Sequence, residues 1–147
     1  MIELEVSSVS LRRSSTIIIL DATMPIDQQP PAEWMNKAAK AASGLSATTV
    51  GVRGASHSVY VILLHDPRRM EPWGLYVGQT SRDPDVRFDQ HKAGYKASSA
   101  ARRFGTRLLP ALVSHLNPMR RWESLELEAG LAEEFRRAGI AWVAGGH

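Results

Sequence analysis

The chain lacks cysteine and a long apolar run, and each absence excludes a class of protein. It contains no cysteine among its 147 residues, so disulfide bridges and thiolate metal sites are excluded. Its longest apolar run, TIIIL at 16–20, is far shorter than the roughly 20 residues that span a membrane. The N-terminus MIELEVSS has neither the basic nor the apolar region of a signal peptide. We therefore expect no membrane association and a cytoplasmic protein.

Aromatic residues are also few, at 7%, whereas the apolar content of 44% and the charged content of 22% are ordinary for one globular domain. The net charge is only +3, but its distribution is uneven. The segment 87–107 holds a single acid, Asp89, and six basic residues: Arg87, Lys92, Lys96, Arg102, Arg103 and Arg107. Acids gather instead in WESLELEAGLAEEF at 122–135. This separation indicates a polyanion site with a carboxylate feature beside it.

Residues 1–56 form the first of two predicted parts, an N-terminal extension of unknown role. The segments IELEV (2–6) and TIIILDA (16–22) have the pattern of strands. A proline-rich loop at 24–34 precedes a predicted helix over 31–43. SATTVGVRGASHS at 46–58 is compatible with another short strand followed by a linker.

Residues 57–147 predict a small α/β (α+β) domain, with an antiparallel central sheet flanked by helices. Strands at 58–64 and 75–80 are joined by the polar loop 65–74. A helix follows at 83–94, with Asp83 as N-cap and Gly94 as its stop, and a second helix at 98–105 is capped by Ser98 or Ser99. A strand from 106 is broken by Pro110. The helix 121–139 and a strand at 140–147 complete the domain, and apolar spacing in that helix selects Leu125, Leu131 and Phe135.

Each strand of the hairpin carries one tyrosine, Tyr60 and Tyr76, where phenylalanine would pack without a hydroxyl to satisfy. Adjacent antiparallel strands can bring two such side chains together. Phosphodiester cleavage needs a base for water, a cation and fixed donors around the phosphate. A tyrosine hydroxyl can orient water, Arg87 offers a fork for phosphate oxygens, and Gly78 leaves space for a phosphate to approach.

The ordered set of SVY at 58–60, YVG at 76–78, Arg87 and Glu128 resembles the GIY-YIG nuclease domain over about residues 57–146. The resemblance implies that Tyr60 is the general base or orients the water, while Tyr76 positions the nucleophile. Arg87 would then stabilise the pentavalent phosphate. Glu128 would hold Mg²⁺ or Mn²⁺, and Glu123 in the same glutamate-rich segment is a competing ligand. His91 shares a helix face with Arg87 and is an alternative base or phosphate donor.

A substrate-contacting surface is predicted around these groups. The residues expected to contact substrate are Gly78, Gln79, Lys92, Lys96, Ser98, Arg102 and Arg103. We interpret the chain as a metal-dependent endonuclease that hydrolyses nucleic acid, with DNA as the expected substrate. Two alternatives remain. One is a nucleic-acid-binding module with impaired catalysis. The other is an interaction or toxin-associated domain that acts through residues 1–56.

Overall fold

The computed structural model describes residues 29–147, so the two strands predicted before residue 23 lie outside the described residues. The elements in chain order are α2 (Ala32–Ser43), β1 (Ser58–His65), β2 (Trp73–Thr80), α3 (Pro84–Ala93), α4 (Ser99–Phe104), β3 (Gly105–Leu108), α5 (Arg121–Arg137) and β4 (Val143–Gly145). Two short 3₁₀ turns, η2 (Pro110–Leu112) and η3 (Ser114–Leu116), lie between β3 and α5. The predicted α+β class is confirmed.

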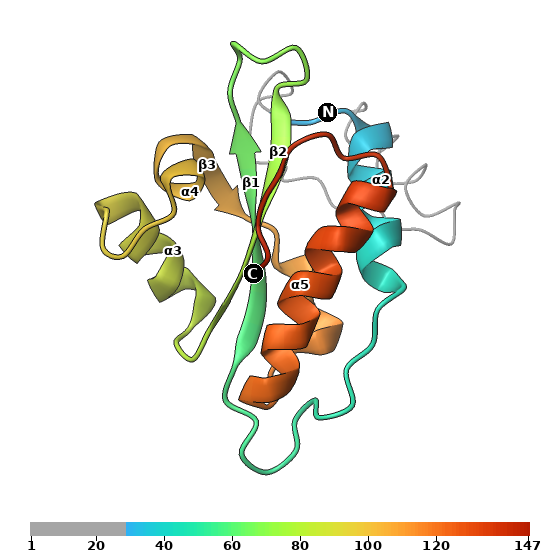
Figure 1. Ribbon diagram of the computed structural model, residues 1–147, viewed down its shortest axis with the longest axis vertical. Coiled ribbons are helices and arrows are strands. Elements are labelled where there is room, and N and C mark those ends of the chain that lie inside the picture. Colours follow the sequence, from blue (N-terminus) through green and yellow to red (C-terminus); the bar gives the residue numbers. More distant parts are fainter. Residues whose placement is uncertain (1–28) are drawn as a thin grey trace, which may run out of the picture.

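The four strands form one sheet in the order β3-β1-β2-β4 (Figure 1). The strands β1 and β2 pair antiparallel from Ser58 opposite Thr80 to His65 opposite Trp73, and β3 is antiparallel to β1. The last strand, β4, instead pairs parallel with β2, so the sheet is mixed and only its first three strands are antiparallel as predicted. Helix α5 supplies the crossover that a parallel return requires.

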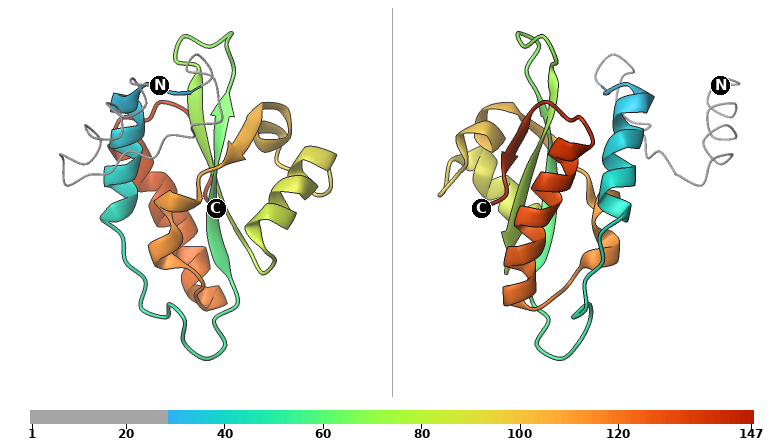
Figure 2. Two further views of the ribbon diagram at one scale, coloured as in Figure 1. Left: turned by 180° about the vertical axis from the view of Figure 1, so that it is seen from behind. Right: turned by 45° about the vertical axis from the view of Figure 1, so that its right-hand side comes forward.

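Helices cover both faces of the sheet, α3 and α4 on one and α5 with α2 on the other (Figures 1 and 2). Alternate residues of the central strands point to opposite faces, because the side-chain period of a strand is two. Odd-numbered residues of β1 and β2 such as Val61, Leu63 and Leu75 enter the core beneath α5 and α2. Even-numbered ones, among them Tyr60 and Ile62, pack beneath α3 and α4.

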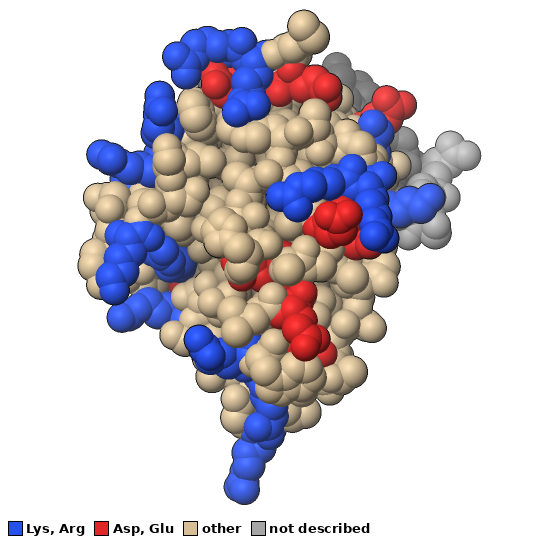
Figure 3. All heavy atoms as spheres, in the orientation of Figure 1, with Lys and Arg blue, Asp and Glu red and all other residues tan. Residues whose placement is uncertain are grey.

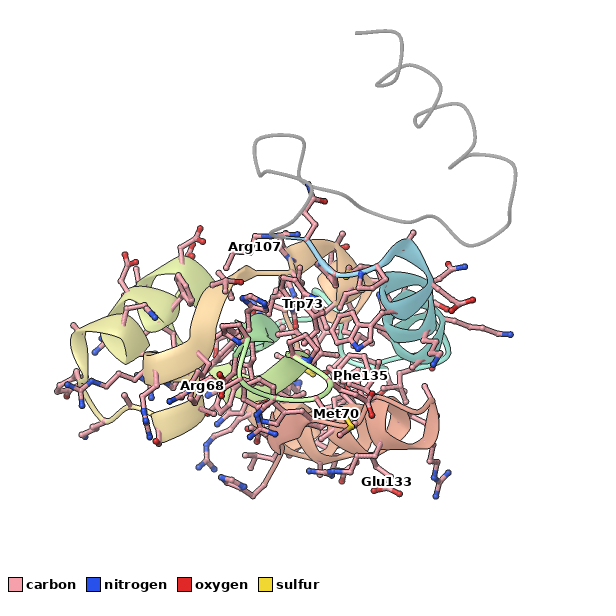
Figure 4. All side chains as sticks on the ribbon, turned by 90° about the horizontal axis from the view of Figure 1, so that it is seen from above. Arg68, Met70, Trp73, Arg107, Glu133 and Phe135 are labelled. Carbon is pink, nitrogen blue, oxygen red and sulfur yellow. The ribbon has the colours of Figure 1, made fainter. Side chains whose placement is uncertain are left out.

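The described part of the N-terminal extension shares the larger core. Helix α2 buries Met35, Ala38 and Ala42 against it, and α2 contacts α5 directly. Phe135 lies between α5 and the sheet, whereas Glu133 on the same helix points outward (Figure 4). Residues 29–56 therefore stabilise the sheet rather than forming a separate unit.

Two local predictions are wrong. The segment 46–56 contains no strand; its chain turns at Gly51 and Gly54, whose φ angles of 69° and 83° do not fit a strand. Leu125, predicted to face the core, is 37% exposed, because the buried stripe of α5 runs through Glu128, Leu131 and Phe135. Within residues 29–147, every helix is too short or too polar to cross a bilayer.

Candidate active site

Two tyrosines and a histidine meet on the sheet face beneath α3. The ring centroids of Tyr60 and Tyr76 are 6.1 Å apart, and His91 lies 6.1 Å from the first and 5.2 Å from the second. The Tyr60 hydroxyl is 2.8 Å from His91 Nε2. The pairing of the tyrosines expected from the hairpin is therefore present, with His91 as a third member.

Local sequence signals place His91 against the tyrosines. Asp83 caps α3 by accepting a hydrogen bond from the Asp85 N–H, and Pro84 occupies the first turn. The helix ends at Gly94, whose φ of 86° is the left-handed conformation that favours glycine. Between these ends, α3 turns His91 toward the sheet and buries it completely.

The hydrogen bonds of His91 define its tautomer. The backbone N–H of Ser98 donates to Nδ1 at 3.2 Å, so in the neutral ring this nitrogen carries no proton. The proton is then on Nε2, which donates to the Tyr60 oxygen. Burial, together with the nearby Arg87 charge, lowers the pKa of His91 to about 4. At neutral pH His91 is an uncharged donor, and both of its ring nitrogens are engaged.

This arrangement gives the two tyrosines different roles. Because Tyr60 accepts from His91, its own proton is available for another acceptor, and the neighbouring phenol on that face is Tyr76. Burial is the largest cause that raises the pKa of both phenols. The hydrogen bond between them raises the pKa of Tyr60 further, whereas it lowers the pKa of Tyr76. Tyr76 is therefore the phenol whose anion is stabilised by its neighbour.

Arg87 lies on α3 one turn before His91 and is half-buried. Its charge is close enough to lower the pKa of Tyr60 and of Tyr76. The guanidinium donates to the carbonyl of Tyr95 at 3.2 Å and to that of Lys96 at 2.7 Å. It thus places a positive charge beside the phenols. It also holds the α3–α4 loop, a contact that the sequence alone did not predict.

Glu128 comes from α5, near enough for its charge to raise the pKa of Tyr60 and Tyr76. The residue is only 7% exposed, and burial raises its own pKa to about 7. Within residues 29–147 no group donates a hydrogen bond to this carboxylate, and no cluster of three or more metal-ligating side chains occurs. A buried carboxylate without donors fits a divalent cation that takes its other ligands from water and phosphate.

Glu123, the competing ligand, is engaged elsewhere. Its carboxylate accepts four hydrogen bonds of 2.5–3.0 Å from the backbone N–H groups and hydroxyls of Thr48 and Thr49. Burial alone would raise its pKa, but these bonds outweigh burial and lower the pKa to about 2. Glu123 therefore clamps the segment before β1 to the start of α5.

The structure gives Gly78 and Gln79 roles other than the predicted substrate contacts. Gly78 lies opposite Tyr60 in the sheet, and a Cβ there would sit 2.5 Å from the tyrosine Cζ and hydroxyl oxygen. The missing side chain makes room for Tyr60, not for a phosphate. Gln79 points to the other face, where its Oε1 accepts from Ser124 Oγ at 3.2 Å. It therefore does not share the face of the two tyrosines.

The basic residues predicted to contact substrate divide into two groups. Lys92 Nζ donates to the carbonyls of Arg102 and Gly105, both at 2.9 Å, so it closes the end of α4 and keeps few donors for a ligand. Lys96, Arg102 and Arg103 are exposed. On the face in Figure 3, Lys and Arg side chains gather over the flank of α3 and α4, while acidic side chains lie mainly toward α5 and the hairpin end. The exposed group adjoins the tyrosine site.

Two contributions to the site were missed by sequence reasoning. Ser98 caps α4 as predicted, but the sequence did not show that its N–H sets the His91 tautomer. Gly145 in β4 is the second, since a Cβ there would lie 2.9 Å from Tyr76 Cε1. The SSAARR capping pattern and the terminal Gly-Gly pair were visible signals, but neither reveals which side chain it serves.

No family model matches this chain, and no curated protein or solved structure is significantly similar to it. The geometry of the tyrosines, His91, Arg87 and Glu128 is therefore what points to a function.

Proposed function

We propose that the protein is a metal-dependent endonuclease of the GIY-YIG type, acting in the cytoplasm on nucleic acid, with DNA as the expected substrate. One observation carries the proposal. Two adjacent phenols, a half-buried arginine and a buried carboxylate without donors converge, and exposed basic residues follow along α3 and α4. These are the groups that hydrolysis of an inert, negatively charged phosphodiester requires.

In the proposed reaction, Tyr76 is the general base. A water oxygen attacks phosphorus, its proton passes to Tyr76, which must enter the step as the phenolate, and the bond from phosphorus to the leaving oxygen breaks. The leaving oxygen takes a proton from solvent, and Tyr76 then releases the water's proton to solvent. Tyr60 donates its hydrogen bond to Tyr76 and stabilises the phenolate. His91 acts only through Tyr60, by fixing the direction of that hydrogen bond, and is a positioning residue. In this proposal Tyr76 takes the role that the sequence suggested for Tyr60 or His91.

Arg87 would stabilise the negative charge that develops on the phosphate oxygens, since it places a cation beside the phenols. Glu128 would hold Mg²⁺ or Mn²⁺ as the one protein ligand, and the bound ion would supply positive charge at the phosphate. Lys96, Arg102 and Arg103 would contact phosphates of the flanking chain, which adds affinity without reading sequence.

The test is cleavage of labelled single-stranded, duplex and branched DNA and RNA, with Mg²⁺, with Mn²⁺ and with a chelator. Glu128→Gln removes the carboxylate charge while keeping the shape of the side chain. Glu126→Gln, two residues away on the exposed side of α5, makes the same change outside the site. We expect metal-dependent cleavage by the wild type and by Glu126→Gln, and loss of cleavage in Glu128→Gln.

Binding of DNA without cleavage in either metal would contradict the proposal and favour the nucleic-acid-binding module. Cleavage by Glu128→Gln at the wild-type rate would likewise remove Glu128 from the reaction.

A further inference from the structure

A cavity of about 570 Å³ opens beside Tyr60, on the side of β1 away from β2. It exists because β3 pairs with β1 only over Ile62–Leu64, so the first half of β1 has no neighbouring strand on that side. The Asn117 side chain takes the place of a strand there. Its amide accepts from the Val59 N–H at 2.9 Å and donates to the Val59 carbonyl at 2.8 Å. Together with the Leu109 N–H, which donates to the Val61 carbonyl, this side chain satisfies the edge without a strand and leaves a hollow.

The cavity has an apolar interior and a polar rim. Val61, Leu108 and Val113 line the interior. The hydroxyls of Ser58, Ser81 and Ser114 also line it, and within residues 29–147 none of the three has a hydrogen-bond partner. Arg82 and Asp83 stand at the same opening, between β2 and α3.

The apolar and polar groups that line the cavity suit the base and phosphate of a single nucleotide. An aromatic base needs apolar walls for its faces, together with donors and acceptors for its edge, and the serine hydroxyls provide both. Arg82 offers the bidentate donors suited to a phosphate. The size lies within the usual range for small-ligand sites, about 300–1,000 Å³. Asp83 and Pro84 line the cavity from the first turn of α3, one turn before Arg87, so an occupant would lie close to the proposed phosphate contact.

We propose that the cavity receives one unstacked nucleotide of the substrate, adjacent to the cleaved bond. The inference rests on the proposed nuclease function and specifies its substrate class. A base in an intact duplex must be unpaired and unstacked before it can enter, at a cost of a few kcal/mol that is least for a base already unpaired. The expected substrate is therefore DNA with an unpaired nucleotide at the cleavage point, such as a flap, a bulge or a single strand.

The first experiment compares cleavage of a fully paired duplex with cleavage of the same duplex carrying a one-nucleotide bulge. Ser114→Trp would fill the cavity from an exposed position, and Arg82→Ala would remove the phosphate contact. Ser46→Trp places the same bulk at an exposed serine that does not line the cavity. We expect the wild type and Ser46→Trp to prefer the bulge at least tenfold, and Ser114→Trp to lose that preference.

A second measurement does not depend on catalysis. Titration of the protein with 2′-deoxythymidine 5′-monophosphate, followed by amide chemical shifts, should perturb Ser58, Ser81 and Ser114 in the wild type but not in Ser114→Trp. Absence of cleavage on every substrate would refute the nuclease proposal. Equal rates on paired and bulged DNA, or a titration that leaves these three amides unchanged, would refute the cavity proposal alone.

Discussion

The two faces of the sheet differ in what their buried side chains do, although the same two strands supply both. Beneath α5 and α2, residues such as Val61, Leu75 and Val77 pack against Phe135 and form an apolar core. Beneath α3, the alternate positions of the same strands bury Tyr60 against His91 and bring Tyr76 beside them. The strand alternation separates a face that stabilises the fold from a face that holds the hydroxyl and imidazole groups.

Burial alone does not identify a residue of the apolar core. Tyr60 is 2% exposed and Val61 is 1% exposed, yet only the tyrosine carries a hydroxyl that needs a buried partner. A buried polar network is stable only when its members are satisfied. Changes on the tyrosine face should therefore affect cleavage, and changes on the face beneath α5 should affect stability.

The largest effect is expected at Tyr76. Tyr76→Phe removes the proposed base and should lower the cleavage rate about 10³-fold, the usual scale of general base catalysis, with little change in thermal stability. Tyr95→Phe, at a tyrosine that is 54% exposed, is the matched control and should cleave normally. Single-turnover rates measure both. A Tyr76→Phe enzyme within a few-fold of the wild type would assign the base elsewhere.

At Phe135, by contrast, a substitution is expected to lower the stability of the fold. Phe135→Ala empties a fully buried position of the apolar face and should lower the free energy of unfolding by about 4 kcal/mol, as measured by urea denaturation. Leu125→Ala, on the same helix but 37% exposed, should change it by less than about 0.5 kcal/mol. Equal effects at the two positions would contradict the placement of the core beneath α5.

Gly78→Ala tests the contact between backbone and phenol on the tyrosine face. The new methyl would collide with Tyr60, and displacement of that ring by about 1 Å should reduce cleavage roughly 10²-fold. Gly130→Ala is the control, since nothing lies within 4 Å of its added methyl and the substitution favours the helix. It should raise stability by about 0.5–1 kcal/mol. Unaltered cleavage by Gly78→Ala would show that Tyr60 can move without consequence.

Glu123 should make stability depend on pH through contacts that do not involve the tyrosine face. Its pKa is about 2 in the folded protein, below the ordinary 4.5, so the unfolded chain binds more protons between these values. Its contribution is therefore present above about pH 4.5 and is lost as the pH falls toward 2. Glu123→Gln should lower stability at pH 7 by about 2 kcal/mol and flatten this part of the profile. Glu126→Gln should keep the wild-type profile, and a slope shared by all three proteins would contradict the assignment.

The smallest effect is expected on the basic flank. Lys96→Ala and Arg102→Ala should each weaken DNA binding and reduce the slope of log K against log salt by about 0.9, since one phosphate contact is lost. Arg136→Ala, in the last turn of α5, should leave the slope unchanged. Fluorescence anisotropy at several salt concentrations gives the slopes. Identical slopes in all variants would remove Lys96 and Arg102 from the DNA-binding surface.

Much of the fold was predictable because its signals are local. Asp83 and Gly94 bound α3, Ser98 caps α4, and Pro110 ends β3, all as expected from the sequence. The segment 46–56 was misjudged because its conformation depends on Glu123, a distant partner. Leu125 was misjudged because helical spacing alone does not show which stripe of α5 faces the sheet.

The candidate site was likewise predictable only in part. The positions of Tyr60, Tyr76, Arg87 and Glu128 in the chain were enough to select them as a group. Their roles were not, because a hydrogen bond from the Ser98 backbone to His91 determines which tyrosine donates to the other. No residue type encodes that direction.

The sequence by itself determined the alternation that puts both tyrosines on one face, the helix ends beside them and the separation of basic from acidic segments. These follow from short-range geometry and composition. Only the tertiary structure decided that Gly78 makes room for Tyr60, that Gln79 points to the other face and that a hollow remains where β3 fails to cover β1. The physical reason is that such contacts join residues far apart in the chain, so the packing of whole elements settles them.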